Sequence, residues 1–251
     1  MERRFERESS TIKNNTTENR NTRNPSPLRR ISLFKCLWVL RFQEQKAEKR
    51  DTFILENAKF TGMDLNKMEN GFRMILEGMG EDPSREGLLD TPKRVAKMYA
   101  ELMTSLRSES NPSEILKTRF HEKYDEMIVV PNIEFASMCE HHFLPFTGRA
   151  FVAYIPGDCV VGLSKIPRVV EYFARMPQIQ ERMTRQIAEL IQKELNPRGV
   201  AVLLEASHMC MTMRGVKKPG ATMVTTQLLG RFKTDEKTRA EFMTYIHREG
   251  C

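Results

Sequence analysis

The order of the apolar segments constrains the fold of this chain more than any other feature of its sequence. Three strand-like runs come first, at 126–130, 133–138 and 148–155. Two helical segments follow within residues 164–195, and Pro177 separates them. Two more strand-like runs complete the order, at 199–207 and 222–232. Strands, then helices, then strands predict an α+β fold in which helices pack on one face of an antiparallel sheet.

A helical region precedes the sheet. Apolar side chains recur at helical spacing over residues 67–79, and Gly80 follows as a helix terminator. Thr91 and Pro92 read as an N-cap and a first helical residue, so a second helix is expected to begin there. We therefore divide this part of the chain into a helical region, 63–118, and an α+β domain, 119–251.

The charge of the chain is unevenly distributed. The formal net charge of +7 invites a nucleic-acid or membrane partner. Residues 1–62, however, carry 14 Lys and Arg against 8 Asp and Glu, while the rest carries 26 against 25. The basic character therefore belongs to an N-terminal extension that we expect to be largely disordered. It is either dispensable or lies upstream of a true start at Met63 or Met68.

One apolar run, 31–42, lies inside the extension, and it is too short to cross a bilayer. A surface-anchoring amphipathic helix is an open alternative for it, but we expect no membrane partner. The five cysteines are odd in number and widely spread, which argues against a disulfide framework. We expect a reducing, cytoplasmic location, in which cysteines bind metals or take part in catalysis.

A cluster of cysteine and histidine carries the clearest chemical signal. Cys139 and His142 are three residues apart, and Cys210 ends a later predicted strand. Two thiolates and one imidazole suit Zn²⁺, and three protein ligands with an open position are typical of catalytic zinc. His141 and His208 then remain beside the metal for proton transfer. A Cys139–Cys210 redox pair and a coincidental spacing are the alternatives.

Two further groups suit an anionic nucleotide. Ser164 begins a predicted helix with Lys165 and Arg168 close behind, and a helix N-terminus with cations nearby binds phosphates. Arg214 belongs to a second basic group. At Gln180-Glu181, a carboxylate next to an amide can meet the donor edge of guanine. Solvated charges and an exposed helix start are the alternatives for these groups.

Assembled in order, these segments resemble the GTP cyclohydrolase I family. The resemblance runs from about residue 65 to 246 and leaves out residues 1–62. The motifs that carry it are LDTPKRVA (89–96), SMCEHHFLPF (137–146), VGLSK (161–165), QIQERMT (178–184) and EASHMCMTMRG (205–215). Pro167 and Met176 depart from the family pattern, without touching a ligand or a base-reading position.

The resemblance implies a specific chemistry. Zinc is held by Cys139, His142 and Cys210, with water in the fourth place. The family converts GTP and water into formate and 7,8-dihydroneopterin triphosphate, the first step of pterin and folate synthesis. Attack at C8 of guanine fits a zinc-activated water, with His141 protonating N7. His208 and Ser164 would then move protons during opening and rearrangement of the ribose.

The resemblance also implies how substrate is held and how the chain assembles. Glu181 and Gln180 take the guanine edge, and three cations hold the triphosphate, with Arg94 a weaker candidate: Lys165, Arg168 and Arg214. The family builds a tunnelling fold, in which sheets join into a barrel across the subunits of a homodecamer. The runner-up is another tunnelling-fold enzyme acting on a pterin or a deazapurine. A nucleic-acid-binding module with structural zinc is disfavoured, because residues 63–251 are nearly neutral.

Overall fold

The computed structural model of the chain describes residues 62–106 and 111–248, with side chains up to residue 246. These residues fall within one unit, Phe60–Cys251. The predictions made for the extension and for its apolar run at 31–42 lie outside the described residues, apart from Gly62. The division at residues 118 and 119 stays a prediction.

The two predicted N-terminal helices are present. Helix α2 (Leu65–Gly78) begins after Asp64, whose carboxylate accepts a hydrogen bond from the backbone N–H of Lys67. It ends before Gly80, which adopts a φ of 83° as a helix-terminating glycine does. Helix α3 (Thr91–Leu102) is capped by Asp90, one residue earlier than predicted. Two short 3₁₀ helices follow, η1 (Thr104–Leu106) and η2 (Pro112–Leu116).

Within the described residues, the main sheet has five strands in the order β5-β2-β3-β6-β7. Neighbouring strands are antiparallel, except that the two-residue strand β5 runs parallel to the end of β2. The sheet is therefore mixed, where an antiparallel one was predicted. Its strands are β2 (Ile128–Cys139), β3 (Pro145–Ile155), β5 (Pro177–Gln178), β6 (Gly199–His208) and β7 (Met223–Gly230). A separate pair consists of β1 (Arg119–Phe120) and β4 (Val160–Val161).

Strand β2 joins two runs that the sequence analysis separated. The register against β3 shifts between Val130 and Ile133, and Asn132 in the gap has a φ of 52°. A β-bulge of this kind absorbs an extra residue without ending the strand. Pro131 and Asn132 lie at this bulge, and in the sequence they resembled a break between two strands. The prediction of two separate strands was wrong, because one strand runs through both residues.

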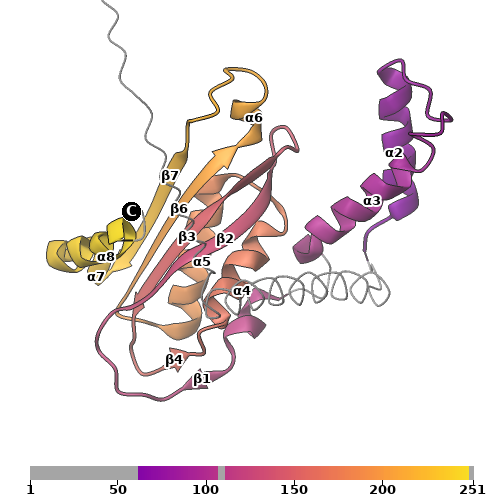
Figure 1. Ribbon diagram of the computed structural model, residues 1–251. Helices are drawn as coiled ribbons and strands as arrows, with labels where there is room; N and C mark the ends of the chain where they lie inside the picture. Colours follow the sequence, from indigo (N-terminus) through magenta and orange to yellow (C-terminus); the bar gives the residue numbers. More distant parts are fainter. Residues whose placement is uncertain (1–61, 107–110, 249–251) are drawn as a thin grey trace, which may run out of the picture. The chain divides into compact units, whose positions relative to one another are not determined.

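Helices α4 (Lys165–Ala174) and α5 (Gln180–Leu195) cover one face of the sheet, as predicted (Figure 1). Val170 of α4 and Ile187 of α5 are fully buried in one core with alternate residues of β3, such as Val152 and Tyr154. The break at Pro177 is the short strand β5, which separates the two helices.

The other face of the sheet is also covered, so the prediction of helices on one face was incomplete. Helix α7 (Arg231–Thr234) contributes Phe232 and helix α8 (Glu236–Arg248) contributes Phe242, and both side chains are fully buried. They pack against Phe151 and Leu203, which point away from the first core. In the described ranges, no helix is long and apolar enough to cross a membrane.

Candidate metal centre and nucleotide site

A tight turn after β2 carries the Cys-Glu-His-His motif. The backbone N–H of Phe143 donates to the carbonyl of Cys139 at 2.8 Å, and the N–H of Cys139 donates to the carbonyl of Leu144 at 2.9 Å. Phe143 adopts a φ of 53° to close the turn. These bonds fold the motif back on itself before β3 begins. Cys139 is buried at 4% exposure, while both histidines of the motif are exposed.

The second cysteine reaches this turn because of the strand order. Strands β2 and β6 both pair antiparallel with β3, so they run in the same direction and their C-terminal ends lie at the same end of the sheet. The short helix α6 (Met209–Thr212) follows β6 directly and carries Cys210 (Figure 1). Burial, and then the neighbouring Cys139, raise the pKa of the Cys210 thiol. The sulfur atoms of the two cysteines lie within 4.8 Å of each other.

Among the described residues, the imidazole that lies beside the two thiols is that of His208. Potential ligand atoms of Cys139, His208 and Cys210 all lie within 4.8 Å of one another. Soft sulfur with one imidazole is a donor set that fits Zn²⁺. His142, the predicted imidazole ligand, instead places Nε2 at 2.9 Å from Nη1 of Arg214. Because a guanidinium only donates, Nε2 of His142 must accept, and its lone pair therefore faces a cation.

The other predicted proton-transfer residues lie around this centre. Nδ1 of His141 is 3.8 Å from Sγ of Cys139. His208 is half-buried, with Nε2 at 2.8 Å from Oε1 of Gln180 and its ring stacked on Phe146. Burial lowers the pKa of His208, and the charge of Glu181 opposes this effect. A lowered pKa favours the neutral imidazole, which is the form that can accept a proton.

Ser164 stands at the N-cap of α4, as predicted, but its side chain makes no capping hydrogen bond. Lys165 and Arg168 occupy the first turn of that helix. Within the described part of the chain, no hydrogen bond or ion pair joins these residues to the Cys-His turn. Of the predicted phosphate ligands, Arg214 contacts the turn through His142, and Arg94 is paired with Asp90 at 3.7 Å.

Gln180 and Glu181 begin helix α5 and differ in exposure. Gln180 is 1% exposed and is hydrogen-bonded within the protein, whereas Glu181 is exposed. The prediction that both read the guanine edge is not tested by these contacts. They show that Glu181 is the accessible member of the pair.

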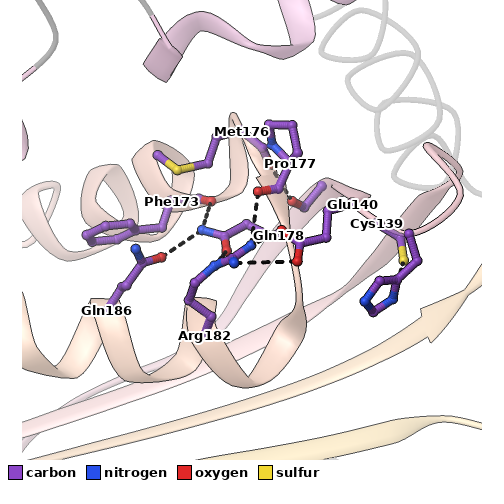
Figure 2. Close-up of polar contacts among 10 residues, drawn as sticks. Cys139, Glu140, Phe173, Met176, Pro177, Gln178, Arg182 and Gln186 are labelled. Carbon is purple, nitrogen blue, oxygen red and sulfur yellow. Dashed lines mark hydrogen bonds and ion pairs between the residues drawn. The ribbon is translucent and has the colours of Figure 1, made fainter.

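Sequence reasoning gave no role to a network that supports the Cys-His turn. Arg182 forms an ion pair with Glu140 of the turn and donates from Nε to Oε1 of Gln178 at 3.1 Å (Figure 2). Gln178 is fully buried, and its Nε2 donates to the carbonyl of Phe173 at 3.0 Å and to Oε1 of Gln186 at 2.8 Å. The QIQER motif contained both Gln178 and Arg182, but it did not indicate which partner each side chain contacts.

The ion pair between Arg182 and Glu140 should affect the thermal stability of the protein in acid. The hydrogen bond from Arg182 holds the pKa of Glu140 below its ordinary value, with the charges of Arg182 and His141 adding to the effect. A lowered pKa stabilises the fold above about pH 4.3, and the stabilisation is lost as pH falls through the lower, folded-state pKa. We expect Glu140→Gln to flatten the fall of Tm in that acidic range. Thermal unfolding from pH 6 to pH 3 measures it.

The matched control for that series is Glu189→Gln. Glu189 is an exposed carboxylate of helix α5 that lies 3.9 Å from Arg185, its i−4 neighbour. An exposed pair of this kind contributes little to stability. Equal acid profiles for the Glu140 and Glu189 variants would contradict the role given to the Arg182 ion pair.

An apolar hollow of about 750 Å³ lies beside the Cys-His turn. Its lining includes His142 and Phe143 from the turn and Phe72 and Tyr99 from the two N-terminal helices. The ring of Tyr99 lies 5.6 Å from that of Phe72 and 5.6 Å from that of Phe143. The N-terminal helices therefore contact the segment that carries the candidate metal ligands.

Comparison with known proteins decides the family. The sequence profile described as GTP cyclohydrolase I matches residues 68–247, which include every candidate site residue. The chain belongs to the GTP cyclohydrolase I family. A protein of Rhodopirellula baltica named GTP cyclohydrolase 1 is 52% identical over 82% of this chain and 89% of its own length. Those of Carboxydothermus hydrogenoformans and Bacillus subtilis are 57% and 55% identical over 73% of this chain and 95% and 96% of theirs.

A solved structure titled as the archaeosine synthase QueF-Like in its apo form also matches this GTP cyclohydrolase I family chain. Its TM-score is 0.37 at 16% identity, covering 43% of this chain and 97% of that one.

The two departures from the family pattern are accommodated locally. Pro167 is the third residue of α4, where no intrahelical N–H bond is lost, and Met176 packs against the main core.

Proposed function

We propose that the chain hydrolyses GTP to formate and 7,8-dihydroneopterin triphosphate. Membership of the GTP cyclohydrolase I family supports this reaction. The observation that carries it is the meeting of Cys139, Cys210 and an imidazole at one edge of the sheet. Thiols and imidazole together are the donor set of a catalytic zinc site rather than of a phosphate-binding site.

Zinc is the metal that this donor set fits, and we assign Cys139, Cys210 and His142 as its ligands. His142 is exposed, and the lone pair of its Nε2 already faces a cation, the guanidinium of Arg214. His208 lies with the two thiols, and the hydrogen bond of its Nε2 to Gln180 leaves only Nδ1 of that ring as a possible ligand atom. When bound, Zn²⁺ would supply a hydroxide-like nucleophile at neutral pH by lowering the pKa of coordinated water.

The protein's own residues then divide the proton transfers. His141, whose Nδ1 lies 3.8 Å from Sγ of Cys139, protonates N7 as the imidazole ring of guanine opens. His208, whose pKa is lowered by burial, takes and returns protons during opening and rearrangement of the ribose. Ser164 assists that second stage from the N-cap of α4.

Substrate contacts follow from charge and exposure. The carboxylate of Glu181 is accessible and accepts from the donor edge of guanine, while adenine presents no matching pair of donors. Lys165, Arg168 and Arg214 hold the triphosphate. Arg94 is the weaker candidate, since Asp90 already pairs with it.

Assembly into a homodecamer, with sheets closed into a barrel across subunits, belongs to the same proposal. Within the described residues, β7 pairs only with β6, and β2 pairs with β5 only at Met138 and Cys139. Open edges of this length pair readily with another chain. Val224 on β7 is apolar and 55% exposed, which supports a partner there.

A cytoplasmic location is also proposed. The cysteines of the described residues, Cys139, Cys159 and Cys210, are all free thiols. Free thiols are the usual state of cysteine in a reducing compartment.

The substrate assay separates the proposed function from its runner-up. Purified protein is incubated with GTP or with dihydroneopterin triphosphate, and formate and the oxidised, fluorescent pterin are measured. We expect formate and pterin in equal amounts from GTP. Turnover of dihydroneopterin triphosphate without turnover of GTP would assign the chain to another tunnelling-fold reaction.

A further inference from the structure

The hydrogen bonds within the Cys-His turn close the turn, but they do not fix it against the rest of the protein. They join the N–H of Phe143 to the carbonyl of Cys139, and the N–H of Cys139 to the carbonyl of Leu144. Both histidines of the turn are exposed. A metal site needs ligands that are held within a few tenths of an ångström by contacts from outside the ligand set. Those contacts have to come from elsewhere in the fold.

The contacts that hold the turn from outside meet at Glu140. Its backbone N–H donates to the carbonyl of Gln178 in β5 at 3.0 Å. Its carboxylate is bound by Arg182 of helix α5, where Nη2 pairs with Oε2 and Nη1 lies 3.5 Å from Oε1. Two guanidinium nitrogens on two carboxylate oxygens fix the direction of both side chains, as a single contact does not. Because Glu140 lies between Cys139 and His142 in the chain, its position constrains theirs.

Arg182 is itself held on its other side. Its Nε donates to Oε1 of Gln178 at 3.1 Å, and its Nη2 lies 3.5 Å from the carbonyl oxygen of Pro177 (Figure 2). The amide of the buried Gln178 cannot turn over, because its Nε2 donates to the carbonyl of Phe173 and a carbonyl only accepts. Oε1 of Gln178 therefore has to face Arg182. The guanidinium is thus anchored on buried groups of β5 and of the end of helix α4.

The Arg182–Glu140 ion pair is precise in geometry but contributes little to folding at neutral pH. The two side chains are 32% and 34% exposed. Ion pairs that solvent reaches to this extent add little to the free energy of unfolding. A contact of this kind can orient the turn without being needed for the fold.

We propose that Arg182 is a positioning residue for the candidate metal centre, which holds the Cys-His turn through Glu140 in the geometry that binds zinc. Within the described residues, no hydrogen bond or ion pair joins Arg182 to Cys139, His142 or Cys210, so its effect passes through Glu140. This role rests on the zinc site of the proposed function and deepens it. It holds for either choice of imidazole ligand, because Cys139 adjoins Glu140 in both.

The charge of Arg182 by itself would have the opposite effect on zinc. A guanidinium repels a nearby cation, so its removal would tighten zinc binding if charge decided the affinity. Positioning predicts weaker binding, because the turn loses the contact that orients it. The direction of the change in the Kd for zinc therefore separates the two effects.

The first test compares Arg182→Met with Arg185→Met on the same helix. Arg185 is an exposed arginine that lies 3.9 Å from Glu189. The Kd for zinc is measured on the metal-free, full-length protein by competition with a chelating dye. We expect Arg182→Met to raise the Kd by about 10–100-fold, the usual effect of losing a residue that orients metal ligands. Arg185→Met should leave it unchanged. Unchanged or tighter binding in Arg182→Met would overturn the proposal.

A second comparison asks whether the effect passes through Glu140. In a Glu140→Met background, Arg182→Met should cause no further weakening of zinc binding, because the carboxylate that it orients is already gone. Equal weakening in both backgrounds would overturn the proposal. The Tm of metal-free Arg182→Met at pH 7 should fall by no more than about 4 °C, as for a solvent-exposed ion pair. A larger fall would assign Arg182 to folding instead.

Cobalt(II) gives a spectroscopic readout of the ligand set, because thiolates bound to it absorb light. We expect Arg182→Met to reach the wild-type thiolate absorption at saturating cobalt, but at a higher free metal concentration. Loss of that absorption at saturation would overturn the proposal in favour of a structural role. Neither titration needs GTP. Normal metal binding without formate from GTP would therefore contradict the proposed reaction alone, whereas a wild type that binds no zinc would overturn the positioning role.

Discussion

Cys210→Ser is expected to remove bound zinc and to lower kcat for formate release by about 10³-fold or more, which corresponds to ~4 kcal/mol of transition-state stabilisation. The reason is the loss of a thiolate that a serine hydroxyl does not replace as a ligand near neutral pH. Zinc per chain and formate from GTP are measured on the same preparation. Full activity in a variant without zinc would contradict the assignment.

The matched control is Cys159→Ala. Cys159 is likewise a free thiol and is buried, whereas Cys210 is partly exposed; the sulfur of Cys159 faces the carbonyl oxygen of Leu195 at 4.0 Å and lies outside the cluster. We expect it to keep zinc and kcat. The same measurement on two histidine variants distinguishes the third ligand: His142→Ala should lose zinc, and His208→Ala should keep it while losing pterin formation. The reverse pattern would assign His208 as the ligand.

Gly148→Ala is expected to have the largest effect on stability. A Cβ at this position of β3 would lie 2.0 Å from the carbonyl oxygen of Glu205 and 2.7 Å from Cα of Ala206. Both are backbone atoms of β6 and cannot move aside without breaking the β3–β6 pairing. We expect a loss of at least about 3 kcal/mol, at the upper end for a single substitution, or failure to fold.

Gly78→Ala is the control for that variant. Gly78 is the last residue of α2, and nothing lies within 4 Å of the position of its Cβ. An alanine there should leave Tm unchanged or raise it slightly, because alanine favours a helix over glycine. Chemical denaturation of both variants measures the difference. Similar stabilities for the two would contradict the described register of β3 against β6.

Periodicity predicted most of the elements because it depends only on local sequence. The N-cap at Ser164 and the break at Pro177 carry local signals that the structure confirms, and the helix expected after Thr91 begins one residue early, at Thr91 itself. Strand β5 could not be predicted in this way. It has two residues, and it exists because the main chain at Cys139 and Gln178 pairs across the sheet.

Helix α8 was missed because its apolar stripe is weak. Among its described side chains, up to residue 246, only Phe242 is fully buried, with Met243 and Ile246 packed less deeply beside it. The need for a second covering layer was nevertheless visible in β3. Its residues Phe151, Ala153 and Ile155 are apolar on the face opposite to the main core, which a strand with one solvent-facing side would not show.

The sequence predicted which residue types form the candidate site, but it predicted few of their hydrogen-bond and ion-pair partners. Residue types and spacing indicated two cysteines and a nearby imidazole, and the family motifs supplied the positions. The partners of Gln180 could not be inferred, because Leu204, Met223 and Thr225 come from strands later in the chain. The same holds for the ion pair between Arg182 and Glu140, which are 42 residues apart.

We propose that this chain is a zinc-dependent GTP cyclohydrolase whose metal is held by Cys139 and Cys210. The most direct test is reconstitution of the metal-free protein: zinc is added stepwise, and the initial rate of formate release from GTP is measured at each step. We expect no formate without zinc and a linear rise in rate that ends at one zinc per chain. Full formate release from the zinc-free protein would contradict this proposal. So would saturation of the protein with zinc without any formate release.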